Sequence, residues 1–283
     1  MAALDGQAFP PNSLEAINAS LAAGADVIEV DITALAERDY LLVHDLTLES
    51  ETTGSGKVGE CTVTQARELF YKGSIYRVPL LSDVVTASQG HGGSTRLQLD
   101  YKNEMPFADD EPFERLVRLI EPLGSRVIVS TVADWQLRKL RKLAGWLDLG
   151  FDIHFYIVWE TGSRDPNEYP KHLGAYGYYD DHPLATERSW PTAAYLADRC
   201  AALIGLVPGV STFYINHQFL AQSLDDGFNW AAALHESGIL CDAWTMDVGN
   251  PAAEANIPRL LEAGIDLFTT NTPSALRAFI AGR

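Results

Sequence analysis

The sequence Gly24-Ala-Asp-Val-Ile-Glu-Val-Asp-Ile32 predicts a buried strand that carries two carboxylates. Its β-branched residues predict a strand over residues 27–32, and its nearly unbroken apolar character indicates burial on both faces, as in a parallel sheet. Because side chains alternate across a strand, Glu29 and Asp31 share one side. Two unpaired carboxylates on a buried strand would cost roughly several kcal/mol. A divalent cation is one partner for their oxygens, and a salt-bridged strand end is the other interpretation.

The bulk composition limits the classes of protein. With 283 residues, of which 47% are hydrophobic, the chain is long enough to form one barrel domain over residues 1–283. No run approaches the roughly 18 apolar residues that a transmembrane segment needs. The net charge of −17 argues against a nucleic-acid partner. If the substrate carries phosphate, a metal or a few placed cations must supply positive charge locally.

The cysteine pattern bears on localisation. Cys61, Cys200 and Cys241 are few, odd in number and far apart in the sequence, which is typical of reduced thiols in a cytoplasmic protein. The first residues lack a basic segment followed by an apolar core, so we expect no secretory signal here, although a signal removed earlier would leave the same sequence. The pattern predicts no particular oligomeric state.

Strands alternate with helices along the chain. Residues 2–4 are a candidate for a very short first strand. After the strand at residues 27–32, the predicted strands are residues 40–43, 96–102, 127–129, 153–159, 213–216, 242–246 and 267–270. The predicted helices begin near Ser13 and then cover residues 112–123, 135–144, 192–203, 230–237 and 253–263. This alternation predicts an α/β fold with a parallel sheet, and about eight strands indicate a closed (β/α)8 TIM barrel.

Polar residues gather at the ends of the predicted strands, where barrels of this class carry their catalytic groups. They are Glu29, Asp31, His44, Asp100, Lys102, Thr245 and Asp247. This coincidence indicates an enzyme.

An ordered set of motifs carries a family resemblance. It comprises Pro10-Pro-Asn-Ser13, the Glu29-Val-Asp31 strand, Val43-His44-Asp45, Thr52-Thr-Gly-Ser-Gly56, Val78-Pro-Leu-Leu81, Leu99-Asp100-Tyr-Lys102, Trp244-Thr245 and Thr270-Asn-Thr-Pro273. The chain resembles the glycerophosphodiester phosphodiesterases, and some motifs are similar to those of the related sphingomyelinase D enzymes. The resemblance implies a TIM barrel with a small insertion after the His-Asp motif, at about residues 46–80.

The resemblance also implies a metal site. By the match, Glu29, Asp31 and Asp100 hold one divalent cation, Mg2+ or Ca2+, and Asp100 is a shortened version of the family's usual Glu. Hard carboxylate oxygens suit these ions. Lys102 is then expected to reach the phosphate of a small phosphodiester substrate as a point charge.

The match is incomplete at the proton-transfer groups, because the family uses two histidines and His44 corresponds to one of them. The other belongs to a His-Arg-Gly opening on the first strand, which would fall at Leu4–Asp5 or at Ala2–Ala3, and no histidine precedes His44. His154 and His217 are candidate replacements. A histidine on or beside a strand is more often structural, and that interpretation stays open for both.

Three further residues are candidates for supporting the site. Asn12 either helps to fix it or caps a helix. Asp45 either orients His44 or is a plain turn acid. Trp244 either walls a pocket for an alcohol moiety or packs in the core.

Two functions follow from these observations. The first is a metal-dependent phosphodiesterase acting on glycerophosphodiesters or a related phospholipid-derived head-group diester. The second is a catalytically impaired member of the family that binds a phosphorylated ligand. In either case residues 160–190 exceed an ordinary connection in length, so we expect them to form a partly mobile lid at the catalytic face.

Overall fold

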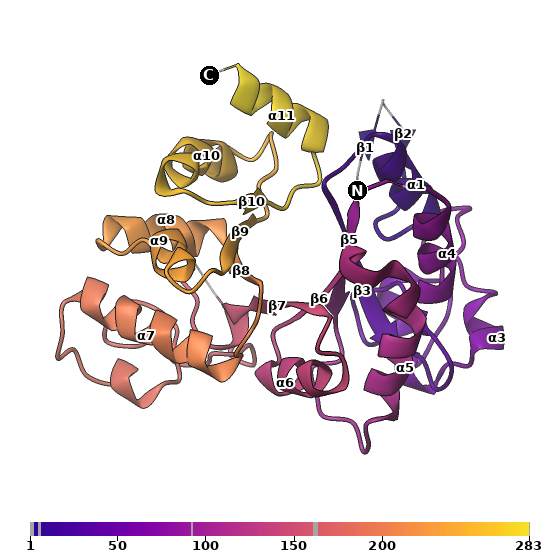
Figure 1. Ribbon diagram of the computed structural model, residues 1–283, viewed down its shortest axis with the longest axis horizontal. Helices are drawn as coiled ribbons and strands as arrows, with labels where there is room; N and C mark the ends of the chain where they lie inside the picture. Colours follow the sequence, from indigo (N-terminus) through magenta and orange to yellow (C-terminus); the bar gives the residue numbers. More distant parts are fainter. Residues whose placement is uncertain (1–2, 5–6, 92, 161–163, 283) are drawn as a thin grey trace. The chain divides into compact units, whose positions relative to one another are not determined.

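The protein is described here by a computed structural model covering residues 3–4, 7–91, 93–160 and 164–282, with side chains from residue 9 onward. The chain folds into two compact units (Figure 1). The N-terminal unit comprises Met1–Thr131 and Trp135–Leu149, and the C-terminal unit comprises Val132–Asp134 and Gly150–Arg283. The single domain over residues 1–283 stays a prediction.

The N-terminal unit is built on strands in the spatial order β4-β3-β5-β6. Their bounds are β3 (Val27–Ala34), β4 (Tyr40–Leu41), β5 (Arg96–Tyr101) and β6 (Val127–Thr131). The pairs β3–β5 and β5–β6 are parallel, whereas β4 pairs antiparallel with β3. Residues 40–43 therefore do not add a parallel strand; only Tyr40–Leu41 form a short antiparallel strand, and the chain then leads through residues 42–43 to His44.

Helices pack against these strands. They are α1 (Leu14–Ala22), α4 (Leu81–His91), α5 (Glu111–Ile120), the 3-10 helix η2 (Glu121–Arg126) and α6 (Asp134–Leu143). Helix α4 lies between α1 and α5 and packs on both (Figure 1). The first segment of the chain pairs with itself: β1 (Ala3–Leu4) and β2 (Gln7–Ala8) form a separate antiparallel pair.

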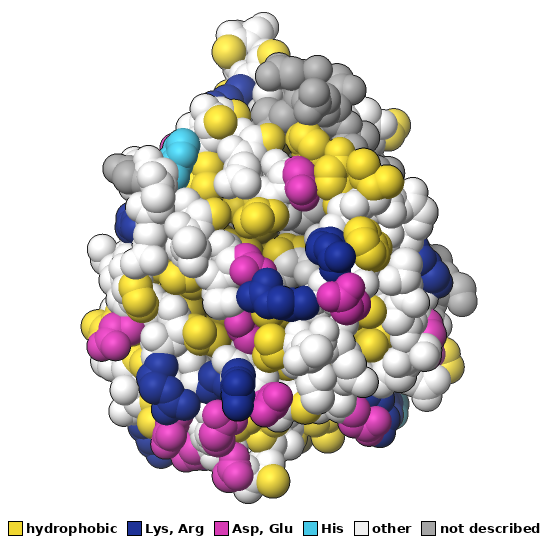
Figure 2. All heavy atoms as spheres, turned by 90° about the vertical axis from the view of Figure 1, so that its right-hand side faces the viewer, with side chains coloured by type: hydrophobic (Ala, Val, Ile, Leu, Met, Phe, Trp, Pro, Cys, Tyr) yellow, Lys and Arg dark blue, Asp and Glu magenta, His cyan; other side chains and the backbone are white. Residues whose placement is uncertain are grey.

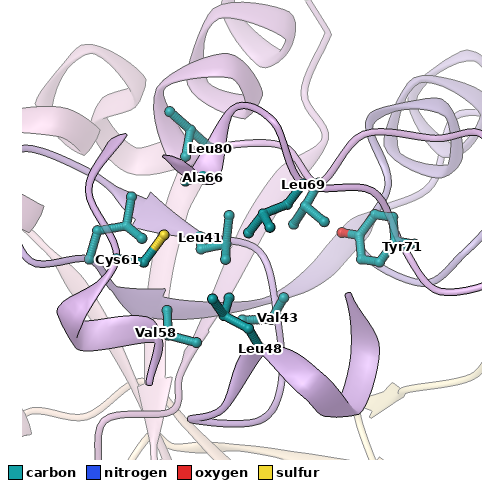
Figure 3. Close-up of a cluster of buried hydrophobic side chains, with 11 residues drawn as sticks. Leu41, Val43, Leu48, Val58, Cys61, Ala66, Leu69, Tyr71 and Leu80 are labelled. Carbon is teal, nitrogen blue, oxygen red and sulfur yellow. The ribbon is translucent and has the colours of Figure 1, made fainter. Parts of the chain in front are cut away.

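The segment after the His-Asp motif folds around a small core of its own. It contains α2 (Leu48–Glu51), η1 (Val58–Glu60) and α3 (Val63–Ala66). Buried side chains from these helices surround Leu41 of β4 and the adjacent Val43 (Figure 3). The Tyr71 hydroxyl donates to the Leu42 carbonyl at 2.9 Å. This packing fixes the backbone immediately before His44.

The C-terminal unit contains consecutive parallel strands. They are β7 (Asp148–Asp152, of which Gly150–Asp152 belong here), β8 (Thr212–Asn216), β9 (Leu240–Trp244) and β10 (Leu267–Phe268). Each pairs with the next along the chain. The helices are α7 (Thr192–Leu206), α8 (His217–Asp225), α9 (Trp230–His235), α10 (Pro251–Ala263) and α11 (Pro273–Ala281). Helices α8 and α10 pack side by side (Figure 1).

One predicted strand is wrong. Residues 153–159 do not form a strand; the strand is β7, which ends at Asp152. The Asp152 carboxylate accepts a hydrogen bond from the His154 amide at 2.9 Å and so caps the 3-10 helix η3 (Ile153–Phe155). The prediction followed the apolar, β-branched composition of the later run. The side-chain cap after Asp152 ends the extended backbone before that run begins.

Part of the predicted lid is anchored by buried groups. The segment contains the 3-10 helix η4 (Pro183–Ala185). Asp180 is buried and accepts from Arg199 Nε at 2.7 Å and from the Tyr195 hydroxyl at 2.6 Å, both on α7. Residues 161–163 lie outside the described part of the chain. The mobility of the lid and its place at the catalytic face stay predictions.

The surface of the described residues carries charges of both signs. Figure 2 shows Lys and Arg side chains lying among Asp and Glu side chains on one face. Ion pairs on the surface of the described residues include Arg67–Asp83, at 3.2 Å. Within the described ranges, none of the helices combines the length and the apolar character needed to cross a membrane.

Candidate active site

The carboxylates of β3 lie on its more open face. Ile28, Val30 and Ile32 are buried, as expected for one side of a sheet strand. On the other side Glu29 is exposed and Asp31 is half-buried. The expectation that both faces of this strand are buried is therefore wrong, and the polar face retains access to solvent and to ligands.

Pairing with β5 brings a third carboxylate to the same place. In the parallel register Asp31 lies opposite Asp100, so their side chains project from adjacent strands on one face. Carboxylate oxygens of Glu29, Asp31 and Asp100 all lie within 4.8 Å of one another. The sequence-based ligand set thus forms one cluster, hereafter the carboxylate cluster.

Lys102 lies against two members of the carboxylate cluster. Its Nζ is 2.9 Å from Asp31 Oδ1 and also contacts Asp100 Oδ2. Burial alone would lower the pKa of Lys102, but the charges of Asp100 and Asp31 outweigh burial and raise that pKa above its usual range. Lys102 is therefore an ammonium ion at any pH near neutrality.

Asn12 holds Asp31 through two hydrogen bonds. Its Nδ2 donates to Asp31 Oδ2 at 2.8 Å, and its Oδ1 accepts from the Asp31 amide at 3.0 Å. Asn12 has a φ of +64°, a left-handed conformation that Asn tolerates better than most residues. The cap of α1 is Ser13, whose Oγ accepts from the Ala16 amide. Of the two interpretations of Asn12, the structure supports the first: Asn12 hydrogen-bonds Asp31, and Ser13 caps the helix.

Asp100 has its own support, which sequence reasoning missed. Ser130 Oγ donates to Asp100 Oδ1 at 3.1 Å, and Gln98 Nε2 donates to Ser130 Oγ at 3.1 Å. Ser130 lies on β6, opposite Asp100 in the parallel register. The alternation of residues 96–102 places Gln98 on the polar face, but no sequence pattern indicates its contact with the next strand.

His44 lies shortly after β4 and is oriented by its neighbour. Its Nδ1 lies 2.8 Å from Asp45 Oδ1. The hydrogen bond from His44 is the largest cause that lowers the pKa of Asp45, with a second contribution from Ser50. An ionised Asp45 accepts the proton of Nδ1, which leaves Nε2 as the nitrogen that gains or loses a proton.

Two acidic residues near His44 were not anticipated. Glu51 Oε1 accepts from the backbone amides of His44 and Asp45 at 2.8 and 2.9 Å, and so fixes the His-Asp turn. Ligand atoms of His44, Asp45 and Glu51 also lie within 4.8 Å of one another, forming a second group of possible metal ligands. Burial raises the pKa of Glu104, against the charge of Lys102.

The residues of the carboxylate cluster fit a hard divalent cation. Three carboxylates supply oxygen ligands of the kind that Mg2+ and Ca2+ prefer. With Lys102 included, the cluster carries two net negative charges, which one divalent ion would neutralise. Asn12 and Ser130 each occupy one oxygen of a ligand side chain, as the outer partners of metal ligands do.

The remaining candidates belong to the C-terminal unit, so their role at the carboxylate cluster stays a prediction. His154 and Trp244 line a small recess at the carboxyl ends of β7, β8 and β9, together with Asp152 and Asn216. Their ring centroids are 5.8 Å apart. Trp244 Nε1 is buried and has no hydrogen-bond acceptor within the described residues. Burial, with the charge of Arg164, lowers the pKa of His154 to about 4, so its imidazole is neutral near pH 7.

His217 has a structural partner. It is buried at the first position of α8, and its Nδ1 lies 3.0 Å from Asn256 Nδ2 on α10. Burial also lowers the pKa of His217. At the opening of the chain, Ala2 and Asp5 lie outside the described residues, and only the backbone of Ala3 and Leu4 is described.

Comparison with known proteins identifies the family. Residues 5–275 match the glycerophosphoryl diester phosphodiesterase family. The chain therefore belongs to this family, whose members are phosphoric diester hydrolases.

One relative matches nearly the whole chain, and another matches a shorter part of it. The chain is 21% identical over 280 residues to a glycerophosphodiester phosphodiesterase of Caldanaerobacter subterraneus subsp. tengcongensis, covering 96% of this chain and 93% of the relative. A shorter match of 64 residues, 38% identical, covers 23% of this chain and 23% of a Mycobacterium tuberculosis protein named as a probable glycerophosphodiester phosphodiesterase 1.

Solved structures show the fold. One is the glycerophosphodiester phosphodiesterase from Agrobacterium tumefaciens, with a TM-score of 0.61, 17% identity and coverage of 96% of this chain and 94% of that one. Another is an Oleispira antarctica phosphodiesterase in complex with the product sn-glycerol-3-phosphate, with a TM-score of 0.61, 16% identity and coverage of 98% and 93%. This likeness confirms the predicted fold class, the α/β TIM barrel of the family.

Proposed function

We propose that this protein is a divalent-cation-dependent phosphodiesterase that hydrolyses glycerophosphodiesters or a related phospholipid-derived head-group diester. The observation that carries the proposal is the convergence of Glu29, Asp31 and Asp100, with Lys102 against two of them, in a chain of this family. The product complex of the Oleispira antarctica relative supports a glycerol phosphate as one product.

In this proposal Glu29, Asp31 and Asp100 hold the cation, Mg2+ or Ca2+. When bound, such an ion neutralises and polarises the phosphate. The Lys102 ammonium supplies a second positive charge, and its contacts with Asp31 and Asp100 fix where that charge lies. Because the two positive groups share the same carboxylates, the phosphate is expected to bind beside the carboxylate cluster rather than elsewhere on an acidic protein.

His44 carries a proton in the proposed reaction. Asp45 holds Nδ1, so Nε2 is available to the substrate, and Glu51 keeps the turn that presents the ring. A positioned histidine of this kind is typically worth about 10²–10⁴-fold in rate. The His44→Ala variant should lose turnover by that order while retaining cation binding.

The impaired-member alternative rests on one observation: no histidine precedes His44 in the sequence. His154 is a candidate replacement, but with a pKa of about 4 its imidazole is neutral near pH 7 and is only a weak base there. His217, buried against Asn256, is a weaker candidate.

The test is hydrolysis of glycerophosphocholine and glycerophosphoethanolamine with added Mg2+ or Ca2+ and with excess EDTA, followed by ³¹P NMR. The proposal expects glycerol phosphate with a metal and none with EDTA, and a cyclic phosphate product would instead indicate intramolecular transfer. The His44→Ala, His154→Ala and His217→Ala variants are measured beside the wild type. Undiminished turnover in EDTA would refute metal dependence. Binding of glycerol phosphate without turnover of either diester would favour the impaired member.

We also propose that the protein functions in the cytoplasm. The three cysteines are all free and buried, which suits a reducing compartment. Fractionation of the cells that make the protein tests this localisation. Finding the protein among periplasmic or secreted proteins would contradict it.

A further inference from the structure

The polar contacts of Asp100 distinguish its two carboxylate oxygens. Oδ2 lies against the Lys102 ammonium, and Oδ1 accepts from the Ser130 hydroxyl at 3.1 Å. These contacts come from different strands, since Lys102 directly follows β5 and Ser130 belongs to β6. The carboxylate is therefore held at both ends, and its rotation about χ2 is restricted.

A second hydrogen bond fixes the direction in which the Ser130 hydroxyl donates. Gln98 Nε2 donates to Ser130 Oγ at 3.1 Å, and both residues are buried. A serine hydroxyl has a single proton to donate. If the Gln98 amide were turned over, its oxygen would take that proton, and Ser130 Oγ would face the Asp100 carboxylate without a hydrogen between them. The network therefore requires Gln98 to donate and Ser130 to pass its proton to Asp100.

The length of the Asp100 side chain explains why the Ser130 and Gln98 contacts matter for cation binding. The Asp100 side chain is one methylene shorter than that of Glu29 in the same cluster, so its carboxylate reaches less far from the strand. A shorter side chain must be aimed more accurately to share an ion with Glu29 and Asp31. Contacts to metal-ligating carboxylates from outer side chains commonly supply such orientation.

We propose that Ser130, oriented by Gln98, is a positioning residue that aims the Asp100 carboxylate at the ion held with Glu29 and Asp31. The inference rests on the proposed cation site and adds residues of β5 and β6 that the motifs do not mark. Ser130 touches no substrate in this account and acts only through Asp100.

The test is isothermal titration of Mg2+ and of Ca2+ into the whole purified protein. Ser130→Ala should weaken cation binding by about 10–100-fold, as for other outer partners of metal ligands. Ser130→Thr keeps the hydroxyl and should restore most of the affinity. Gln98→Met keeps the size but loses the donor, and should weaken binding by a smaller factor.

Ser223→Ala is the matched control. Ser223 is a buried serine of the C-terminal unit whose Oγ likewise donates once, to the Phe219 carbonyl, and accepts once, from Trp230 Nε1. Its removal should lower the melting temperature about as much as Ser130→Ala does, because each variant loses a buried hydroxyl with two partners. Cation affinity should not change in this control.

The outcomes separate the inference from the proposed function. If the wild type binds neither cation, the proposed metal site fails, and the inference fails with it. If the wild type binds and Ser130→Ala binds equally well, only the positioning role is overturned. Should Ser130→Ala not fold, Gln98→Met decides the matter, and wild-type affinity in that variant would overturn the inference.

Discussion

Aspartates on the parallel strands of the two units experience opposite environments. In the N-terminal unit Asp31 and Asp100 are half-buried, and both oxygens of each carboxylate have a partner. Asn12 and Lys102 contact Asp31, and Ser130 and Lys102 contact Asp100. In the C-terminal unit Asp242 of β9 is buried, and both of its oxygens accept from the neutral Thr269 hydroxyl, at 3.0 and 3.1 Å.

The difference shows how one residue type serves two purposes. Burial raises the pKa of Asp242 to about 8, although the Thr269 hydrogen bond lowers it, and the nearby charge of Asp152 adds to the rise. A carboxyl group in that environment is mostly neutral near pH 7 and is a poor cation ligand. Asp31 and Asp100 keep a charged partner and access to solvent, which are the conditions under which carboxylates bind ions.

The largest effect is expected at Asp31. The Asp31→Asn variant keeps the shape of the side chain but loses the charge shared with Lys102 and the proposed ion. We expect turnover of a glycerophosphodiester to fall roughly a thousandfold, about 4 kcal/mol of transition-state stabilisation. Steady-state kinetics at saturating Mg2+ measure this. The matched variant Asp242→Asn should retain wild-type turnover, and a comparable loss there would remove the contrast between the two units.

A smaller effect is expected at Asn12. The Asn12→Gly variant tolerates the φ of +64° and removes both hydrogen bonds to Asp31, so affinity for Mg2+ should fall by about tenfold. The concentration of Mg2+ giving half-maximal turnover reports the change. Arg38→Gly is the control, because Arg38 is exposed and has the same φ of +64° without contacting Asp31. Equal shifts in both variants would mean that Asn12 acts through the backbone alone.

The smallest effect on activity, and a distinct effect on stability, is expected at Asp242. Its pKa is about 8 in the folded state and near 3.8 when unfolded, so the folded protein binds more protons between these values. Stability contributed by this group is therefore greatest below about pH 4 and falls as the pH rises to about 8, by on the order of 1 kcal/mol per pH unit. Asp242→Asn should remove this slope and raise the melting temperature at pH 8.

Urea unfolding of the wild type and of Asp242→Asn from pH 5 to 9 measures the slope. The exposed Asp198→Asn variant serves as control and should follow the wild type. Parallel curves for the wild type and Asp242→Asn would show that Asp242 does not titrate in the folded state over this range.

Sequence patterns could predict the carboxylate cluster because its geometry is a property of paired strands. Alternation places Glu29 and Asp31 on one side of β3, and the parallel register with β5 adds Asp100. The prediction of a strand at residues 153–159 was wrong for a local reason, because the hydrogen bond from the His154 amide to the Asp152 carboxylate ends β7 where the apolar run begins. Gly150 and the aspartates of β7 weakened the signal of the true strand.

Other features depend on contacts between segments distant in sequence. Ser130 meets Asp100 only because β6 pairs with β5, and a serine in an apolar strand carries no mark of that role. Helix α8 was missed because it starts directly after β8, where Asn216 accepts from the Gln218 and Phe219 amides and no loop separates the elements. The absence of a histidine before His44, where the family resemblance implies one on the first strand, was visible in the sequence alone.

The most direct test of the account is a crystal structure grown with Ca2+, with anomalous data to locate the ion. We predict one strong peak among Glu29, Asp31 and Asp100, with oxygen–metal distances of about 2.3–2.6 Å. A peak at His44, Asp45 and Glu51 instead, with none at the carboxylate cluster, would contradict the central claim.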